Sequence, residues 1–146
     1  MCGLAGGINQ PASLVRSMLK KIEHRGGDGQ GVIESGTATH GHVRLALLDL
    51  TEASSQPFKY HDTVLSFNGE IWNYRELRAE LENRGVKFHT TGDTEVLAAM
   101  LYEYGKAALC PLEGMRVTHL GKFRFILPRV QQALFGHQNA KLSLRL

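Results

Sequence analysis

Three segments of the chain place apolar residues three or four positions apart, the spacing of one face of an α-helix. Ser13–His24 is the first of them, with Ser13 as its expected N-cap. Tyr74–Arg84 and Asp93–Tyr104 show the spacing more clearly, and a glycine, a common helix terminator, follows each at once. The pattern therefore predicts three helices.

Shorter apolar or alternating stretches predict β-strands. Cys2–Ile8 contains three glycines, which would allow other backbone to approach closely. Thr63–Phe67 alternates and leads into Asn68-Gly69, a turn signal. Arg25–Gly31 and Glu52–Lys59 are expected loops. The other predicted strands are Val32–Glu34, His42–Leu48, Val86–His89 and Phe123–Leu127, and Val130–Phe135 is a predicted helical turn.

The composition fits one globular domain with its own core, since 146 residues are 42% hydrophobic and 21% charged. The sequence has no apolar run long enough to span a membrane and no signal-peptide pattern, so we expect a cytoplasmic protein. Cys2 and Cys110 are too few for a disulfide framework. No CxxC or His/Cys cluster suggests zinc.

The charge distribution changes abruptly at Met115. Residues 1–115 hold 11 Lys/Arg and all 14 Asp/Glu, whereas residues 116–146 hold 6 Lys/Arg and no acid. A basic tail can contact nucleic acid or an anionic membrane. Its basic residues are scattered, however, and no RNA-binding motif accompanies them, so we expect neither partner.

Cys2 carries the most informative chemistry. If Met1 were removed, Cys2 would hold both a thiol and a free α-amine, whose pKa lies near ~7.7–8. The thiol is a strong nucleophile and the amine could accept its proton. On position alone, however, a small apolar residue that opens a strand is the commoner role for Cys2.

Other polar groups suggest a ligand. Asn68 and Gly69 could point two donors at one oxyanion, although a hairpin turn is the simpler interpretation. Arg44 lies among apolar residues and needs a carboxylate from the protein or a ligand. Asp93 is by default an N-cap, yet with Glu70 it could hold an ammonium group. Together these groups fit an α-amino acid with an amide side chain.

The glycine-rich run RGGDGQG at Arg25–Gly31 could cradle a phosphate, but it matches neither GxxxxGK[ST] nor GxGxxG. We expect such a loop to pack tightly beside a site instead.

Five motifs occur in an order that resembles a known family: MCGLAGGI, HRGGDGQG, HVRLALLDL, FNGEIWNYRELRAEL and TGDTEVL. They resemble the glutaminase domain of class II (N-terminal nucleophile) glutamine amidotransferases. The NGEIxNYRELR and RLxxxDL runs favour the glutamine-hydrolysing asparagine synthetase branch over the amidophosphoribosyltransferase and glucosamine-phosphate synthase branches. The likeness extends from Met1 to about Met115.

The resemblance implies an α+β fold of the Ntn-hydrolase type, a four-layer αββα sandwich of two antiparallel sheets, which we expect to be incomplete at the C-terminus. It also implies roles for seven residues. These are Cys2 as nucleophile, Asn68 and Gly69 as oxyanion hole, Arg44 as carboxylate anchor, Glu70 and Asp93 as amine partners, and Arg25 in the loop beside the site.

The implied function is hydrolysis of the glutamine side-chain amide to glutamate and ammonia, as the ammonia-supplying half of an asparagine synthetase-like enzyme. This half would need no cofactor or metal. ATP and Mg would belong to a synthetase domain, whose SGGLDS-type loop this sequence lacks, so a separate synthetase domain or chain is the expected partner. Oligomeric state is left open.

Two alternatives remain. The chain could be an inactive remnant or a glutamine-binding module without turnover. It could also be an N-terminal nucleophile hydrolase that acts on another amide, although Arg44 and Asp93 suit a free amino acid better.

The chain departs from the family pattern in two places. Gly27 stands where the family has proline in HRGPDG, so we expect a looser loop. Residues 116–146 match nothing in the family, which continues with an apolar strand of the FAFALWD type. We therefore divide the chain into a glutaminase domain, residues 1–115, and a divergent basic tail, residues 116–146. Our hypothesis is that the tail comes from a frameshift or rearrangement, and that the domain is truncated after about Met115. A tail that docks on a partner is the rival.

Overall fold

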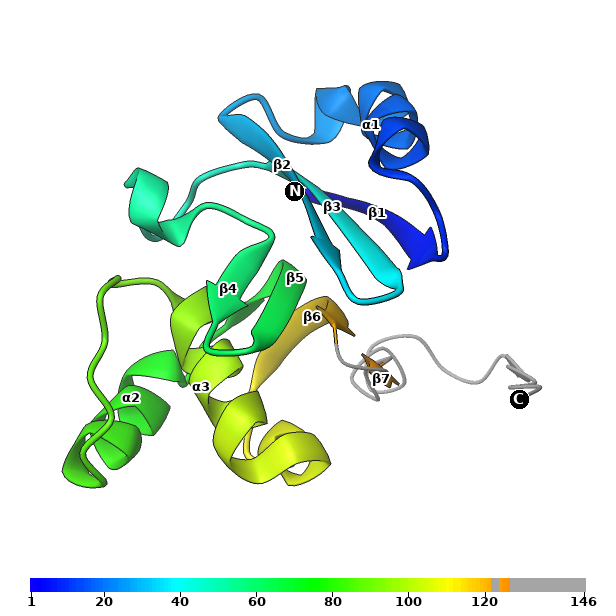
Figure 1. The fold of residues 1–146 in the computed structure, drawn as a ribbon. Coiled ribbons are helices and arrows are strands. Elements are labelled where there is room, and N and C mark those ends of the chain that lie inside the picture. The colour runs from blue at the N-terminus through cyan, green and yellow to red at the C-terminus, as the bar shows by residue number, and fades with distance from the viewer. Residues whose placement is uncertain (122–123, 127–146) are drawn as a thin grey trace, which may run out of the picture.

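A computed structural model describes residues 1–121 and 124–126 of the chain. These residues form the strands and helices that are labelled in Figure 1. The strands are β1 (Gly3–Ile8), β2 (Gly29–Ser35), β3 (Ala38–Arg44), β4 (Phe58–Tyr60), β5 (Thr63–Ile71), β6 (Gly114–Gly121) and β7 (Arg124–Ile126). The helices are α1 (Ala12–Lys21), α2 (Tyr74–Asn83) and α3 (Asp93–Tyr104), with 3₁₀ turns at Glu23–Arg25, Glu52–Ser54 and Gly105–Leu109.

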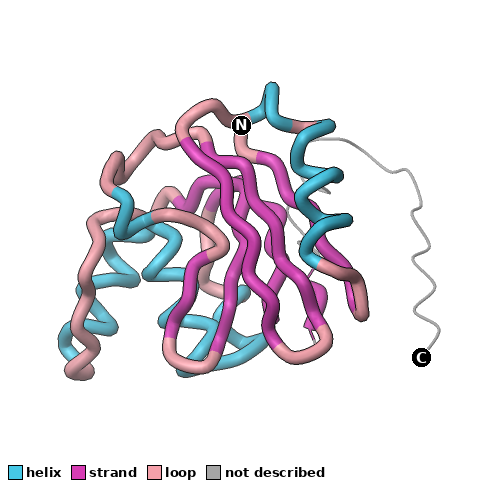
Figure 2. The backbone as a smooth tube through the Cα atoms, turned by 45° about the horizontal axis from the view of Figure 1, so that its top comes forward, coloured by secondary structure: helices cyan, strands magenta, loops and turns pink. Residues whose placement is uncertain are grey.

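The strands form two antiparallel sheets, with the orders β1-β3-β2 and β4-β5-β6-β7. Helix α1 packs on the first sheet, and α3 packs on β4 and β5 of the second sheet with α2 beside it (Figures 1 and 2). Strands β1 and β3 contact β5, so the two sheets face each other. This arrangement confirms the predicted αββα sandwich.

The main core lies between the second sheet and its two helices. Helix α2 buries one face through Leu77 and Leu81, as its spacing predicts. Helix α3 is buried from Asp93 to Leu101, because it lies between α2 and the sheet. The two glycines that follow these helices, Gly85 and Gly105, have φ values of +91° and +55°, which confirms them as helix terminators.

On the first sheet, close packing of α1 determines which way the β3 side chains point. A Cβ atom on Gly41 would lie 2.5 Å from Cγ1 of Val15 in α1 and 3.0 Å from the backbone oxygen of Ala5, so only glycine fits. Successive side chains of a strand point to opposite faces. His40 and His42 therefore point toward the second sheet, and both are fully buried.

Several local predictions are wrong, and each has a physical reason. Helix α1 begins at Ala12 with Pro11 as its N-cap, so Ser13 is already inside the helix. Strand β3 ends at Arg44 instead of Leu48, because the segment after it curls around the Arg44 guanidinium. No strand forms at Val86–His89, where the Glu95 carboxylate accepts the hydrogen bond of the last backbone N–H.

Two expected loops contain strand residues, since β2 already begins at Gly29 and β4 begins at Phe58, before the expected loop ends at Lys59. Strand β7 lies within the predicted strand Phe123–Leu127. The predicted turn Val130–Phe135 lies outside the described residues. Strand β6 crosses the expected boundary at Met115 and pairs with β5 along its length.

Candidate active site

Cys2 immediately precedes β1 and is held at two points. The Leu45 backbone N–H lies 3.3 Å from the Cys2 Sγ, and the thiol lies 3.5 Å from the Leu45 carbonyl oxygen. Arg25 donates a hydrogen bond from Nε to the Cys2 carbonyl oxygen at 3.0 Å. The sulfur and the backbone of Cys2 are thus both fixed, and the thiol remains partly exposed.

A cavity of about 320 Å³ opens at the thiol. It is lined by Cys2, Gly3, Leu4, Ile22, Arg25 and Asn68. Asn68 comes from the second sheet and Cys2 from the start of the first, so the cavity lies where the two sheets meet. Its size suits a small-molecule ligand. Three of the seven residues that the sequence suggested are brought together here.

Asn68 and Gly69 lie within a continuous strand. They pair in register with Val117 and Arg116 of β6, so the hairpin turn that the Asn-Gly pair suggests does not form. Asn68 is half-buried and Gly69 is exposed. Gly69 does not line the cavity itself, but it directly follows a residue that does.

Arg44 ends β3 with its guanidinium on backbone carbonyl groups, where a carboxylate partner was expected from the protein or a ligand. Its NH1 donates to the Thr51 oxygen at 2.8 Å and its NH2 donates to the Asp49 oxygen. A guanidinium has five N–H donors, so donors remain for a ligand carboxylate. The loop from Leu45 to Thr51 is thus folded around the base of Arg44.

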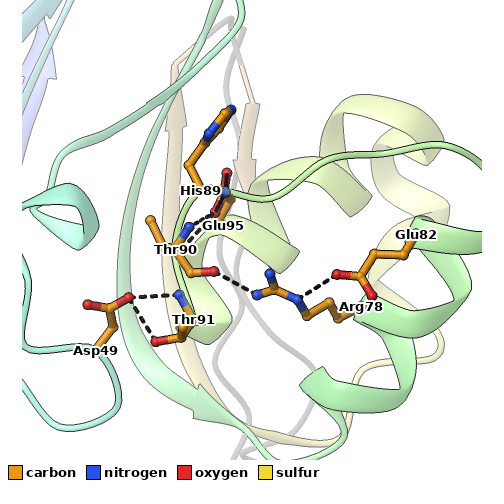
Figure 3. Close-up of polar contacts among 7 residues, drawn as sticks. All are labelled: Asp49, Arg78, Glu82, His89, Thr90, Thr91 and Glu95. Atoms are coloured by element: carbon orange, nitrogen blue, oxygen red, sulfur yellow. Dashed lines mark hydrogen bonds and ion pairs between the residues drawn. The ribbon is translucent and has the colours of Figure 1, made fainter.

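The Asp49 carboxylate, which sequence reasoning missed, ties this loop to the start of α3 (Figure 3). It accepts hydrogen bonds from the N–H and hydroxyl of Thr51 at 2.9 and 2.6 Å. It also accepts them from the N–H and hydroxyl of Thr91 at 2.7 and 3.0 Å. The Thr51 hydroxyl and then the Thr91 N–H hold the pKa of Asp49 well below its usual range. The RLxxxDL run contained this residue, but its spacing alone gave no partner.

Asp93 is the first residue of α3, and Gly92 is the N-cap, so the predicted capping role is wrong. Its carboxylate instead accepts a hydrogen bond from the Ile71 N–H at 3.0 Å. Burial raises the pKa of Asp93, and the nearby Glu70 charge raises it further. Two carboxyl groups at this end of β5 would be stabilised in their ionised forms by a ligand ammonium. Like Arg44, both lie outside the lining of the 320 Å³ cavity.

The glycine-rich loop packs beside the site, as expected. The Asp28 N–H donates to the Arg44 oxygen at 3.0 Å, and the Asp28 carboxylate accepts a hydrogen bond from the Ala46 N–H at 2.8 Å. Asp28 is a second residue that the sequence did not single out. It holds the loop against the segment that contacts the Cys2 thiol.

Within residues 1–121 and 124–126, no three His, Cys, Asp or Glu side chains are grouped in a way that could hold a metal ion. Every helix in this described part of the chain is too short or too polar to cross a lipid bilayer.

The two facing sheets, with a cysteine at the edge of one and an asparagine amide on the other, define an N-terminal nucleophile hydrolase type of fold. The chain belongs to the glutamine amidotransferase domain family, whose model matches residues 1–121. The structure is similar to glutamine phosphoribosylpyrophosphate amidotransferase from B. subtilis, with a TM-score of 0.69 and 23% identity, over 82% of this chain and 35% of that chain.

Sequence relatives point to one branch of the family. The chain is 39% identical over 125 residues to asparagine synthetase [glutamine-hydrolyzing] 1 of Bacillus subtilis, covering 79% of this chain and 20% of the relative. It is 34% identical over 122 residues to asparagine synthetase B [glutamine-hydrolyzing] of Escherichia coli, covering 79% of this chain and 22% of that relative. The chain thus spans about a fifth of the length of these curated relatives.

Proposed function

We propose that this chain hydrolyses the side-chain amide of glutamine to glutamate and ammonia, with Cys2 as the nucleophile. The observation that carries the proposal is the cavity that Cys2 shares with Asn68 and Arg25. It brings a thiol from the start of the first sheet and an amide donor from the second sheet to one cavity, as acyl transfer requires. Membership of the glutamine amidotransferase domain family supports glutamine as the substrate.

The proposed reaction begins once Met1 is removed and the Cys2 α-amine is free. The amine, directly or through water, takes the thiol proton, and the thiolate forms a C–S bond with the amide carbon. Asn68 and Gly69 stabilise the oxyanion. The C–N bond then breaks, the leaving nitrogen takes the proton from the ammonium, and ammonia departs. Water cleaves the thioester, which releases glutamate and restores the thiol.

The remaining residues would hold the amino-acid end of glutamine. Arg44 would bind the α-carboxylate through the donors that Asp49 and Thr51 leave unused. Asp93 and Glu70 would bind the α-ammonium, and its charge would offset the repulsion between the two carboxylates. The proposed steps use protein groups and water only.

We further propose that the ammonia serves an asparagine synthetase-like reaction. The names of the B. subtilis and E. coli relatives support this assignment. ATP and Mg would then act on a separate synthetase domain or chain, and the protein would work in the cytoplasm. The division of the chain at Met115 and the frameshift origin of residues 116–146 remain hypotheses. Reading the coding DNA in the other two frames tests the frameshift, and finding no family-like sequence there would count against it.

Two measurements on one preparation test the proposed hydrolysis. Mass spectrometry of the N-terminus establishes whether Met1 is removed, and a coupled assay measures glutamate release from glutamine. We expect the processed chain to release glutamate, Cys2→Ala to abolish the release, and Cys110→Ala, at an exposed thiol, to leave it unchanged. Retained Met1, or no glutamate from processed protein, would refute catalysis. Calorimetric binding of glutamine without turnover would instead indicate a binding module.

A further inference from the structure

The backbone of Phe67, the residue before Asn68, takes hydrogen-bond partners from two buried side chains. Its N–H donates to Oε1 of Gln56 at 2.6 Å, and its carbonyl oxygen lies 3.1 Å from Nε2 of His42. A carbonyl oxygen only accepts hydrogen bonds, so the Nε2 of His42 carries the proton. Burial lowers the pKa of His42 to about 4, which keeps the ring neutral at pH 7.

Gln56 occupies a place where a strand partner would otherwise lie. Phe58 of β4 pairs with Leu65 of β5, so the antiparallel register continued by two residues sets Gln56 opposite Phe67. The Gln56 side chain therefore replaces a backbone partner on this edge of β5. The backbone groups of Asn68, the next residue, point to the other edge, toward β6.

Gln56 is fixed in turn by both halves of the sandwich. A Cβ atom on Gly31 of β2 would lie 2.5 Å from the Gln56 carbonyl oxygen, so the Gln56 backbone packs directly on the first sheet. The Gln56 Nε2 donates to the Thr94 hydroxyl of α3 at 3.4 Å. Gln56 is only 8% exposed. It thus joins the first sheet, β5 and α3.

His42 provides the second connection between the sheets. It lies in β3 opposite Leu4 of β1, close to Cys2, and its ring reaches across to Phe67 of β5. A direct hydrogen bond at the Phe67 carbonyl group therefore links the first sheet to the strand that carries Asn68 and Gly69.

We propose that Gln56 and His42 are positioning residues for the oxyanion hole, acting through the Phe67 backbone. The inference rests on the proposed glutamine hydrolysis and names the groups that hold Asn68 and Gly69 in place for it. Neither side chain lines the cavity at Cys2. A displacement of about 1 Å at a reacting group can cost about a hundredfold in rate. Because positioning acts on the transition state, the effect falls on kcat and leaves KM nearly unchanged.

The test compares Gln56→Met, which removes the acceptor at similar length, with Ser66→Ala. Ser66 is a buried neighbour on β5 whose hydroxyl has no partner among the described residues. We expect Gln56→Met to lower kcat by about tenfold to a hundredfold with KM within about threefold. Ser66→Ala should match wild type, and Gln56→Glu, which keeps an acceptor, should recover part of the loss.

The rate at which iodoacetamide alkylates Cys2 separates a positioning effect from a general structural defect, because only a general defect would change it. Alkylation needs the thiol but no oxyanion hole, so its rate should be the same in Gln56→Met and wild type. An unchanged kcat, or a parallel loss of kcat, substrate affinity and alkylation, would overturn the proposal. If Gln56→Met does not fold, the two His42 variants replace it. His42→Gln keeps a hydrogen-bond donor, so its kcat should exceed that of His42→Leu by about tenfold. Equal kcat values in the two variants would overturn the proposal.

A second probe separates this inference from the proposed function. The aldehyde analogue of glutamine, glutamate γ-semialdehyde, adds a thiol across its C=O bond and places the resulting oxygen in the oxyanion hole. It requires no turnover. If processed wild type releases no glutamate, the hydrolytic proposal fails, yet aldehyde affinity still reports the hole. Gln56→Met should weaken the affinity for the aldehyde about tenfold relative to wild type. If Gln56→Met does not fold, His42→Leu should bind the aldehyde about tenfold more weakly than His42→Gln. Equal affinities would overturn the positioning role.

Discussion

The carboxylate of Asp49 accepts hydrogen bonds from both the backbone N–H and the hydroxyl of Thr91, 42 residues further along the chain. The Asp49 backbone oxygen meanwhile accepts a hydrogen bond from the Arg44 guanidinium. Thr91 lies two residues before Asp93. One aspartate thus connects the two groups proposed to hold opposite ends of an amino acid.

Asp49→Asn should therefore weaken both folding and substrate binding. An amide offers one acceptor oxygen and turns an NH₂ group toward donors, so at least one buried hydrogen bond is lost. We expect the free energy of unfolding to fall by about 1–3 kcal/mol and the KM for glutamine to rise. Urea titration and the glutaminase assay measure these. Glu52→Gln, an exposed carboxylate in the 3₁₀ turn that follows, is the matched control and should change neither.

Arg44→Lys should act on substrate affinity. An ammonium group keeps the charge but lacks the planar fork that contacts the Asp49 and Thr51 oxygens while leaving donors for a ligand. We expect KM for glutamine to rise about tenfold or more, which corresponds to the loss of one hydrogen bond to a charged group. Arg75→Lys, an exposed residue of α2, serves as the control. An unchanged KM would exclude Arg44 as the carboxylate anchor.

His42 should make the fold sensitive to mild acid. Its folded-state pKa of about 4 lies below the ordinary value of 6.5, chiefly through burial and also through the Arg44 charge, although the hydrogen bond to Phe67 opposes the shift. The folded state thus binds fewer protons than the unfolded state between these values. Stability is full above pH 6.5, falls as pH drops toward 4, and loses about 3 kcal/mol in all from this group.

Urea titrations at pH 7 and pH 4.5 on wild type and His42→Gln measure this loss, and the variant should show less of it. Asp49 contributes in a lower window, since its pKa is depressed and its contribution is lost only as pH falls below the ordinary value of 3.8. The raised pKa of Asp93 acts in the opposite direction. Equal pH dependence in the two proteins would show that His42 does not titrate in this range.

The helices were predictable because their signals are local: Leu77 and Leu81 lie one turn apart, and Gly85 follows the C-cap residue Arg84. The end of β3 could not be predicted in this way, since the segment LALLDL that follows Arg44 has the composition of a strand. The Arg44 guanidinium instead holds the carbonyl groups of Asp49 and Thr51 in a loop.

In the candidate site, too, some residues could be predicted from the sequence and others could not. Cys2 and Asn68 could be proposed from motifs, and the structure places both at one cavity. Gln56 and Asp49 could not, because their partners lie 11 and 42 residues away and depend on how the sheets pack. A buried side chain that replaces a strand partner leaves no periodic signal.

Glu95→Gln should destabilise the fold without touching the proposed chemistry. This carboxylate is 2% exposed and accepts hydrogen bonds from the His89 N–H and from the N–H and hydroxyl of Thr90 (Figure 3). We expect the free energy of unfolding to fall by about 1–3 kcal/mol, measured by urea titration, with kcat unchanged. Glu103→Gln, on an exposed site of the same helix, should equal wild type. A drop in kcat for folded Glu95→Gln would show that this carboxylate also positions groups at the site.

Two adjacent glycines in the HRGGDGQG motif should respond in opposite ways to alanine. A Cβ atom on Gly26 would lie 2.5 Å from the carbonyl carbon and oxygen of Arg44, and backbone cannot yield cheaply. One on Gly27 meets nothing within 4 Å. We therefore expect Gly26→Ala to cost about 1–3 kcal/mol of unfolding free energy and to raise the KM for glutamine by displacing Arg44.

Gly27→Ala should instead stabilise the chain by about 0.4–1 kcal/mol, because alanine restricts the unfolded state and the native position has room for it. Its kinetic constants should match wild type. Thermal unfolding and the glutaminase assay, run on both variants side by side, measure the contrast. If Gly26→Ala behaved like Gly27→Ala, the close approach of this loop to Arg44 would not exist in solution. The loop would then have no part in positioning the carboxylate anchor.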